Sequence, residues 1–190
     1  IGKDETIPSV DINSDIDFSL SVGTWITETP NVSIKISDSE SGVENFKWCL
    51  GIDCEPNNLV NGDKLDIEIE DTKGTQLCII AQDNYNNTSE KVCTETFTVD
   101  TTLPEFTGEF KDINIQLNQE MDLKDGIEVK DVTSGIDGEY EIIEEPKFDP
   151  SKAGTYKVTY KAIDNAGNVS EVIRYITVEG DVPEVSYSIE

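Results

Sequence analysis

Hydrophobic and polar residues alternate along most of this chain of 190 residues, in short runs separated by turn-forming positions. In residues 32–36, for example, Val, Ile and Ile are separated by Ser and Lys. A period of two places apolar side chains on one face of a half-buried β-strand. No stretch has the 3.6-residue period of a long helix, so the pattern predicts an all-β chain. The alternating runs cover residues 32–36, 46–50, 65–69, 77–81, 97–99, 113–117, 127–129, 156–162 and 176–178.

One segment occurs twice. Residues 81–90 and residues 162–171 carry Ala, Asp, Asn, Asn, Ser and Glu at the same offsets. Each copy lies between two alternating runs, which is typical of a hairpin closed by an Asp/Asn-rich turn. A repeat at this spacing indicates tandem copies of one fold.

Three similar junctions divide the sequence: Asp4 to Pro8, Asp100 to Pro104, and Asp181 to Pro183. Proline cannot donate to a β-ladder and therefore suits the edge position where a first strand begins. We predict two tandem immunoglobulin-like β-sandwich domains, residues 1–100 with all four cysteines and residues 101–180. Residues 181–190 are expected to begin a following module or form a tail, in a longer protein from which this chain is a piece.

The cysteines are expected to form disulfides within single sheets. Trp48 should face the core, so its neighbour Cys49 faces outward and the usual bond between the two sheets is not predicted. A tight turn at residues 51–52 would bring Cys49 opposite Cys54, and a symmetric hairpin would bring Cys78 opposite Cys93. The alternative joins Cys49 to Cys78 across adjacent strands.

The second predicted bond carries a conflict of parity. Cys93 shares its parity with the inward Phe97, whereas Cys78 shares its parity with the outward Ile80; a bulge in the last strand would reconcile them. Four cysteines suggest an oxidising compartment. The chain has no His and no Cys-x-x-Cys pair, which argues against a zinc site or a thioredoxin motif.

The formal net charge is −26, from 40 acidic and 14 basic residues. Nucleic acids and anionic membranes attract basic surfaces, so neither is expected as a partner. No run of 18 apolar residues is present that could insert as a transmembrane helix. The acidic surface is therefore either a solvated face or a set of ligands for divalent cations.

Calcium is the cofactor that these acids could bind, and otherwise none is expected. Residues 11–15 resemble the opening of a calcium loop, with Asp11, Asn13 and Asp15 as candidate ligands. Ile16 and Val22 replace the Gly and Glu that an EF-hand needs, so only another type of site is considered. Asp83 and Asp164 in the repeated turns are further candidates, although turn hydrogen bonding alone would explain them.

Catalysis is not expected. Without His the usual triads and the commonest general base are absent, and no nucleophile or phosphate-binding motif occurs. With so many acids, carboxylate pairs arise by chance. Trp25 is a candidate ligand contact, because aromatic anchors are common in binding sites, or it is a lid on the core.

Residues 154–168, followed by residues 174–178, resemble bacterial Ig-like surface repeats with the pattern GTYxVTYxAxDxAGN…RxxTV. The first module resembles a related type through residues 38–43 and 48–50, and departs from it at Tyr85-Asn86. The resemblance implies a cell-surface or secreted protein of Gram-positive-type bacteria, in which such repeats form stalks without catalytic residues. We therefore predict an extracellular, non-catalytic spacer that presents another domain of the same protein. The alternative is an adhesin whose loops bind host protein or glycan.

Overall fold

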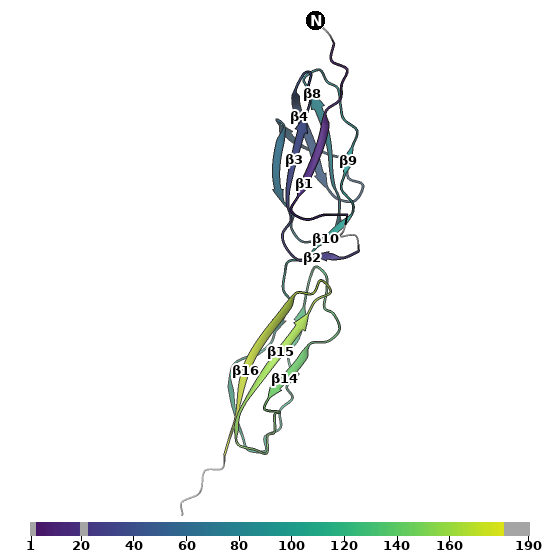
Figure 1. The fold of residues 1–190 in the computed structure, drawn as a ribbon. Coiled ribbons are helices and arrows are strands. Elements are labelled where there is room, and N and C mark those ends of the chain that lie inside the picture. Colours follow the sequence, from purple (N-terminus) through teal and green to yellow (C-terminus); the bar gives the residue numbers. More distant parts are fainter. Residues whose placement is uncertain (1–2, 20–22, 181–190) are drawn as a thin grey trace, which may run out of the picture. The chain divides into compact units, whose positions relative to one another are not determined.

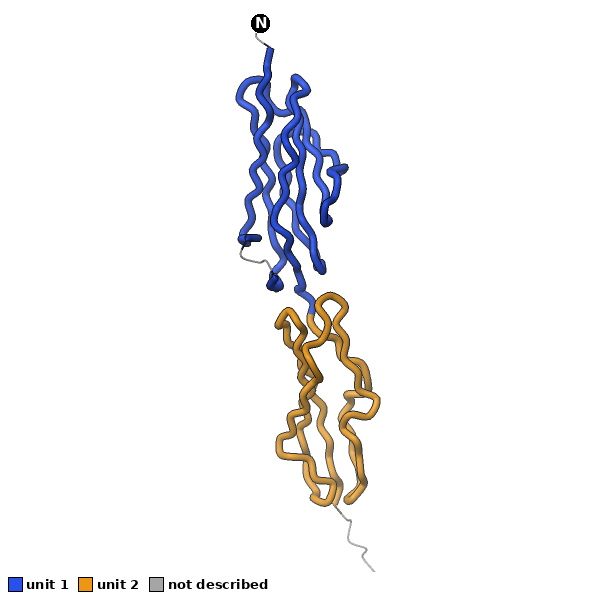
Figure 2. Tube along the Cα trace, turned by 90° about the vertical axis from the view of Figure 1, so that its right-hand side faces the viewer, with its two compact units in different colours: residues 1–102 blue, residues 103–190 orange. Residues whose placement is uncertain are grey.

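The structure is a computed structural model that describes residues 3–19 and 23–180. The predicted following module at residues 181–190 and the calcium-loop position Val22 lie outside the described residues. The chain is all-β; the described residues contain no helix (Figure 1). Within the described ranges, no helix has the length and apolar character needed to span a membrane. The chain divides into two compact units, residues 1–102 and residues 103–190 (Figure 2).

Unit 1 contains three sheets that enclose one core. The first sheet has the order β1-β3-β6, the second β5-β4-β8-β9, and the third β2-β10-β7. The strands are β1 (Ser9–Ser14), β2 (Trp25–Ile26), β3 (Asn31–Ser37), β4 (Val43–Leu50), β5 (Asn58–Asn61), β6 (Lys64–Glu68), β7 (Thr72–Thr75), β8 (Leu77–Asp83), β9 (Val92–Cys93) and β10 (Phe97–Val99).

The core of unit 1 follows the alternation of the sequence. Strand β3 buries Val32, Ile34 and Ile36 and exposes every residue between them. These side chains belong to one apolar cluster with Phe46 of β4 and the apolar residues Leu77, Ile79, Ala81, Phe97 and Val99 of β8 and β10. Along β4 the alternation breaks at its end: Trp48 is half-buried against the core, Cys49 is buried although the alternation predicts that it faces outward, and Leu50 is exposed.

Unit 1 has two disulfides: Cys49–Cys54 joins β4 to the loop that follows it, and Cys78–Cys93 joins β8 to β9 within the second sheet. They are the pairings that the hairpin geometry predicts. In the alternative, Cys49 would bond to Cys78. These two residues are direct neighbours in the register of β4 and β8, yet each bonds elsewhere.

The parity conflict at Cys93 is resolved by a break in the strand. Cys78 pairs directly with Cys93. The hairpin is not symmetric about its turn, because the bridge Gln82↔Thr88 is one residue out of register with this pair. The chain then leaves this sheet, and residues 94–96 have no strand structure. Phe97 begins β10 in a different sheet, so its inward direction places no constraint on Cys93.

Unit 2 is built around one long hairpin. Strands β15 (Gly154–Ile163) and β16 (Val169–Glu179) pair antiparallel from Gly154↔Val178 to Ile163↔Val169. Around this hairpin, a four-stranded sheet has the order β12-β16-β15-β14, and a two-stranded sheet pairs β11 with β13. These strands are β11 (Glu105–Thr107), β12 (Ile113–Gln116), β13 (Glu128–Lys130) and β14 (Glu141–Glu145).

The core of unit 2 centres on Tyr160, which is fully buried. The rings of Phe106, Phe110 and Tyr140 lie around it, with centroid distances of 5.3 to 6.5 Å. Its hydroxyl donates to the Leu123 carbonyl at 2.8 Å. Burial raises the pKa of Tyr160, so the hydroxyl stays a donor.

Arg174, the only arginine of the chain, is buried beside this aromatic core. Its guanidinium lies 5.3 Å from the Tyr160 ring centroid, a distance suited to a cation–π interaction. Its Nη atoms donate to the carbonyls of Glu109 and Leu123. Among the described residues no carboxylate forms an ion pair with it. Arg174 thus ties β16 to two loops through carbonyl groups and a ring.

Replacing Cys78 and Cys93 by Ala should lower the free energy of unfolding of unit 1 by about 3 kcal/mol, because the bond closes a loop of sequence separation 15. The Cys49/Cys54 double variant should cost about 2 kcal/mol, because its separation is only 5. Trp25 and Trp48 are the only tryptophans and both lie in unit 1, so urea unfolding followed by tryptophan fluorescence reports on this unit alone. A larger loss of unfolding free energy in the Cys49/Cys54 variant than in the Cys78/Cys93 variant would contradict the explanation by loop entropy.

Replacing Arg174 by Met should lower the stability of unit 2 by about 3 kcal/mol, because buried carbonyls lose charged donors. The control is Lys161→Met on the same hairpin, whose ion pair with Glu171 is partly exposed. This control should change stability by less than about 1 kcal/mol. Near-ultraviolet circular dichroism of the tyrosines, four of which are described in unit 2, measures the transition. Equal losses in the two variants would show that Arg174 has no special role.

Candidate metal centre

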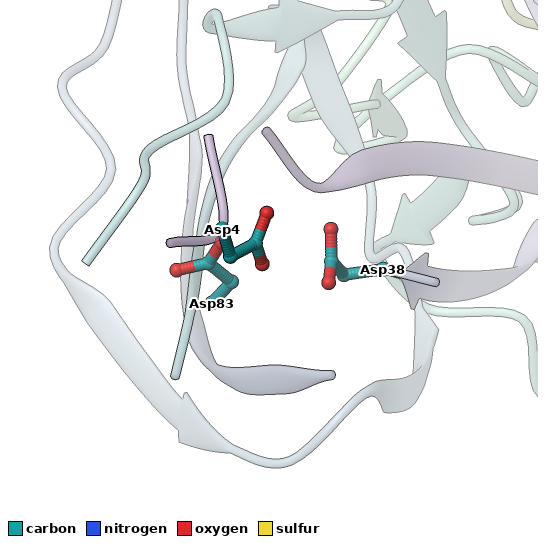
Figure 3. Close-up of side chains that lie close together, drawn as sticks. All are labelled: Asp4, Asp38 and Asp83. Atoms are coloured by element: carbon teal, nitrogen blue, oxygen red, sulfur yellow. The ribbon is translucent and has the colours of Figure 1, made fainter. Parts of the chain in front are cut away.

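Three aspartates from separate segments of unit 1 meet at one end of its sandwich: Asp4 before β1, Asp38 after β3, and Asp83 at the end of β8. We call them the aspartate cluster (Figure 3). Each offers a carboxylate oxygen, and these three oxygens all lie within 4.8 Å of one another. Oxygen donors of this kind suit hard divalent cations.

Asp38 is held by the loop that joins β3 to β4. Its Oδ1 accepts the backbone N–H groups of Glu40 at 3.1 Å, Ser41 at 2.8 Å and Gly42 at 3.0 Å. The Ser41 N–H is the main cause of a lowered pKa for Asp38. Gly42 has φ of 78°, and an added Cβ would lie 3.4 Å from the Asn84 amide nitrogen. This tight loop therefore needs glycine at position 42.

Asp83 is completely buried and organises the turn that follows β8. Its Oδ1 accepts the N–H groups of Tyr85 and Asn87, both at 2.8 Å. Its Oδ2 accepts the Asn87 side-chain amide at 2.7 Å. The same amide donates to the Asp4 carbonyl at 3.3 Å, so the turn also holds the incoming chain.

Asp4 is only 6% exposed, and its two carboxylate oxygens have different surroundings. Oδ1 accepts the N–H and the hydroxyl of Thr6 at 2.8 and 2.7 Å. Oδ2 is buried and accepts no hydrogen bond. The nearby Ser41 hydroxyl, and then that of Thr6, lower the pKa of Asp4 to about 2. Asp4 is therefore ionised at neutral pH, with one buried oxygen left over.

The charge of the aspartate cluster is not balanced by a cation from the described protein. None of the ion pairs of the described residues involves Asp4, Asp38 or Asp83. Glu40 lies two residues after Asp38, and the charge of Asp4 raises the pKa of Glu40. The end of unit 1 thus concentrates negative charge around a buried oxygen.

Unit 2 repeats the loop and the turn. Asp131 Oδ1 accepts three successive N–H groups, from Thr133, Ser134 and Gly135, just as Asp38 does. Asp164 is 1% exposed, and its Oδ1 accepts the N–H groups of residues 166 and 168. Carboxylate oxygens of Asp131 and Asp164 also lie within 4.8 Å of each other.

The side chain of the residue after each turn aspartate docks the turn on its loop. Asn84 donates to the Ser41 carbonyl at 2.8 Å, and Asn165 donates to the Ser134 carbonyl at 2.8 Å. The repeated Asp-Asn pair of the sequence therefore has a structural function in both units, whether or not a metal binds.

Of the candidate calcium ligands, Asp83 lies in the aspartate cluster and Asp164 lies beside Asp131. Asp11 and Asn13 do not form a loop: both are exposed on strand β1, opposite Lys35 and Ser33. An extended strand spreads successive side chains apart, so these residues do not converge with Asp15. Asp15 is bonded to the backbone and side-chain amides of Asn31 instead.

The sequence interpretation did not include Asp4, Asp38 and Asp131 among the ligands. A signal was present: Asp-x-Thr-x-Pro occurs at residues 4–8 and 100–104, and Asp-x-x-Ser-Gly at residues 38–42 and 131–135. Trp25 lies half-buried in β2, opposite Thr98. A ligand contact at Trp25 stays a prediction.

Comparison with known proteins finds one family whose description matches part of the chain, within the second unit. Residues 104–178 match the family described as "Bacterial surface protein, Ig-like domain". No curated protein matches the chain in sequence.

Three solved structures are similar over most of the chain. The M60 catalytic domain with CBM51 domains of Clostridium perfringens ZmpB has 14% identity and a TM-score of 0.35; the match covers 82% of this chain and 19% of that one. The fibronectin(III)-like modules of Clostridium thermocellum CbhA have 12% identity and a TM-score of 0.33, over 96% and 100%. Protocadherin gammaB7 EC3-6 has 16% identity and a TM-score of 0.32, over 92% and 51%. Likenesses at these TM-scores support no conclusion about this chain.

Replacing Asp38 by Ala should lower the urea midpoint of unit 1, because three N–H groups lose their acceptor. Asp38→Asn keeps an acceptor oxygen and should lose less. Since the pKa of Asp38 is lowered in the folded unit, its charge stabilises above the ordinary value of 3.8, and this stabilisation is lost as pH falls through the folded value. The urea midpoints of wild type and Asp38→Asn should therefore become equal in acid, as unfolding followed by tryptophan fluorescence can show. A difference in urea midpoint between the two proteins that stays constant at all pH values would show that the charge of Asp38 does not stabilise the fold.

Proposed function

We propose, on the premise that residues 104–178 belong to the bacterial surface Ig-like family, that this chain is a non-catalytic extracellular spacer in a bacterial surface protein. It would hold another domain of the same protein away from the cell. The observation that carries the proposal is the direction of the chain through each unit.

In unit 1 the chain arrives at one end of the sandwich and leaves at the other. The arriving segment is bonded at the far end of β3: Ser9 pairs with Ser37 in the strand register, and their hydroxyl groups lie 2.8 Å apart. The departing segment is bonded at the opposite end: Thr101 N–H donates to Asp71, which follows β6, and β6 pairs with the first residues of β3. The seven residues of β3 between these ends span about 23 Å.

Unit 2 has the same organisation. Its first strand pairs at Glu105↔Lys130, next to the Asp131 loop that docks on the hairpin turn. Its last strand ends beyond Val178, at the other end of the hairpin. A domain whose two ends lie at opposite poles adds its full length to a stalk.

Strand pairing in unit 2 is suited to carry tension. Strand β12 pairs in parallel with the last strand, from Ile113↔Ile176 to Gln116↔Glu179. Pulling the two ends of the unit apart slides these strands past each other, so several ladder hydrogen bonds must break together. In unit 1 the disulfides add covalent closure to the second sheet.

Nothing in the described carboxyl groups favours catalysis over structure. The groups with a lowered pKa accept hydrogen bonds from nearby backbone or side-chain donors, as Asp38 and Asp149 do. The Ser151 hydroxyl, and then Lys152, lower the pKa of Asp149 to about 2 in a surface turn. The chain has no His to serve as a base near neutral pH.

A binding screen tests the spacer against the adhesin. The chain is presented to a glycan array and to immobilised matrix proteins, and the spacer is expected to show no saturable binding. The variant Trp25→Ala removes the candidate contact, and Tyr85→Ala, which changes another accessible aromatic, is the matched control. Saturable binding that Trp25→Ala abolishes and Tyr85→Ala keeps would replace the spacer by an adhesin.

A further inference from the structure

We infer that the aspartate cluster of unit 1 is a calcium site, with Asp4, Asp38 and Asp83 as ligands. The inference deepens the proposed spacer function, on which its biological meaning rests, by giving the arriving chain segment a cation-dependent anchor. Figure 3 shows the Asp4 carboxylate between the other two, with its oxygens turned toward Asp38.

The buried oxygen of Asp4 separates this cluster from an ordinary group of surface acids. A buried carboxylate oxygen without a donor is costly, and native structures rarely leave one unsatisfied. Asp4 Oδ2 is such an atom, and its residue is 6% exposed. A cation bound among the three carboxylates would satisfy it and would supply the positive charge that the described ion pairs do not provide.

The remaining oxygens are already fixed in position. Asp38 Oδ1 and Asp83 Oδ1 accept backbone N–H groups, and Asp4 Oδ1 accepts two donors from Thr6. These bonds hold the carboxylates before any ion arrives, so little side-chain freedom is lost on binding. Asp38 Oδ2 lies 3.2 Å from the Thr6 hydroxyl, whose single proton is donated to Asp4 Oδ1 at 2.7 Å, and so Oδ2 retains capacity for an ion.

Calcium fits this arrangement better than magnesium. Calcium accepts six to eight oxygens in irregular geometry, whereas magnesium demands a near-ideal octahedron and keeps several of its waters. The ligands here come from three separate segments, which suits the irregular geometry that calcium accepts. Extracellular calcium modules bind with dissociation constants on the order of 10⁻⁴ to 10⁻³ M, and we expect that range here.

The ion would join segments that are far apart in the sequence. Asp4 belongs to the arriving chain, Asp38 to the β3–β4 loop and Asp83 to the β8 turn. Without the ion, the arriving segment is held at this end by the Asn87–Asp4 contact and the pairing of Ser9 with Ser37. Calcium would therefore set how firmly the chain is attached where tension enters unit 1.

The test is urea unfolding of the full chain, followed by tryptophan fluorescence, in chelator and in rising calcium at constant ionic strength. We expect a saturable rise of the unit 1 midpoint in wild type. Asp4→Asn keeps the acceptor for Thr6 but removes the charge, and it should abolish the rise. The matched control is Asp11→Asn, which removes one exposed charge on β1 and should still show the rise of the midpoint with calcium.

Isothermal titration with calcium gives a second readout. The number of bound ions should fall by one in Asp4→Asn and stay unchanged in Asp11→Asn. If Asp4→Asn does not fold, Asp38→Asn decides instead: it keeps the acceptor oxygen for the loop N–H groups and removes one ligand charge, so it should weaken calcium binding several-fold.

Three results would overturn the calcium site: no saturable effect at millimolar calcium, an equal effect in Asp4→Asn, or an equal effect of magnesium. None of them would make the chain an adhesin. Conversely, saturable glycan binding that Trp25→Ala abolishes would contradict the spacer function, but it would not affect the evidence for the calcium site.

Discussion

A buried aspartate in a tight hairpin turn is the constraint on which both units depend. Asp83 and Asp164 are almost fully buried, and each accepts two backbone N–H groups and one Asn side chain. A buried carboxylate without these donors would be strongly destabilising. These donors fix the conformation of the turn in both units. In unit 2 the turn leads into the central hairpin, which keeps one register from Ile163↔Val169 to Gly154↔Val178.

The same turns explain how each sandwich is closed at one end. The Asn after each turn aspartate docks on the Asp-x-x-Ser-Gly loop, whose aspartate gathers three successive N–H groups. In unit 1 this arrangement brings two carboxylates together before Asp4 joins them. Asp38 and Asp83 thus come close together because the loop and the turn that they organise pack against each other. The arriving chain adds Asp4, whose Oδ2 has no hydrogen-bond donor.

The alternation of the sequence predicted the all-β fold because burial on one face of a strand leaves a period of two, as in β3. The repeated Asp-Asn turns and both disulfides could also be predicted from the sequence, since Cys78 and Cys93 lie opposite each other on the two arms of one hairpin. The ligands of the aspartate cluster could be predicted only in part from the sequence. Asp11, Asn13 and Asp15 form a loop-like motif in sequence, but their segment is a strand and its edge. Asp4, Asp38 and Asp83 are brought together by tertiary structure. The recurring Asp-x-Thr-x-Pro and Asp-x-x-Ser-Gly motifs mark two of the segments but do not show that the segments meet.

Burial, and not charge, distinguishes the aspartate cluster within a chain of net charge −26. An exposed acid such as Asp11 keeps its hydration, so the addition of calcium changes its free energy little beyond screening. Asp4 has already lost water from one oxygen, and its ionised state is held by Ser41 and Thr6. The cost of that desolvation is incurred on folding, so an incoming ion meets a ligand that no longer has to be dehydrated. For this reason the aspartate cluster would bind an ion more selectively than exposed acids such as Asp11, which only attract counterions.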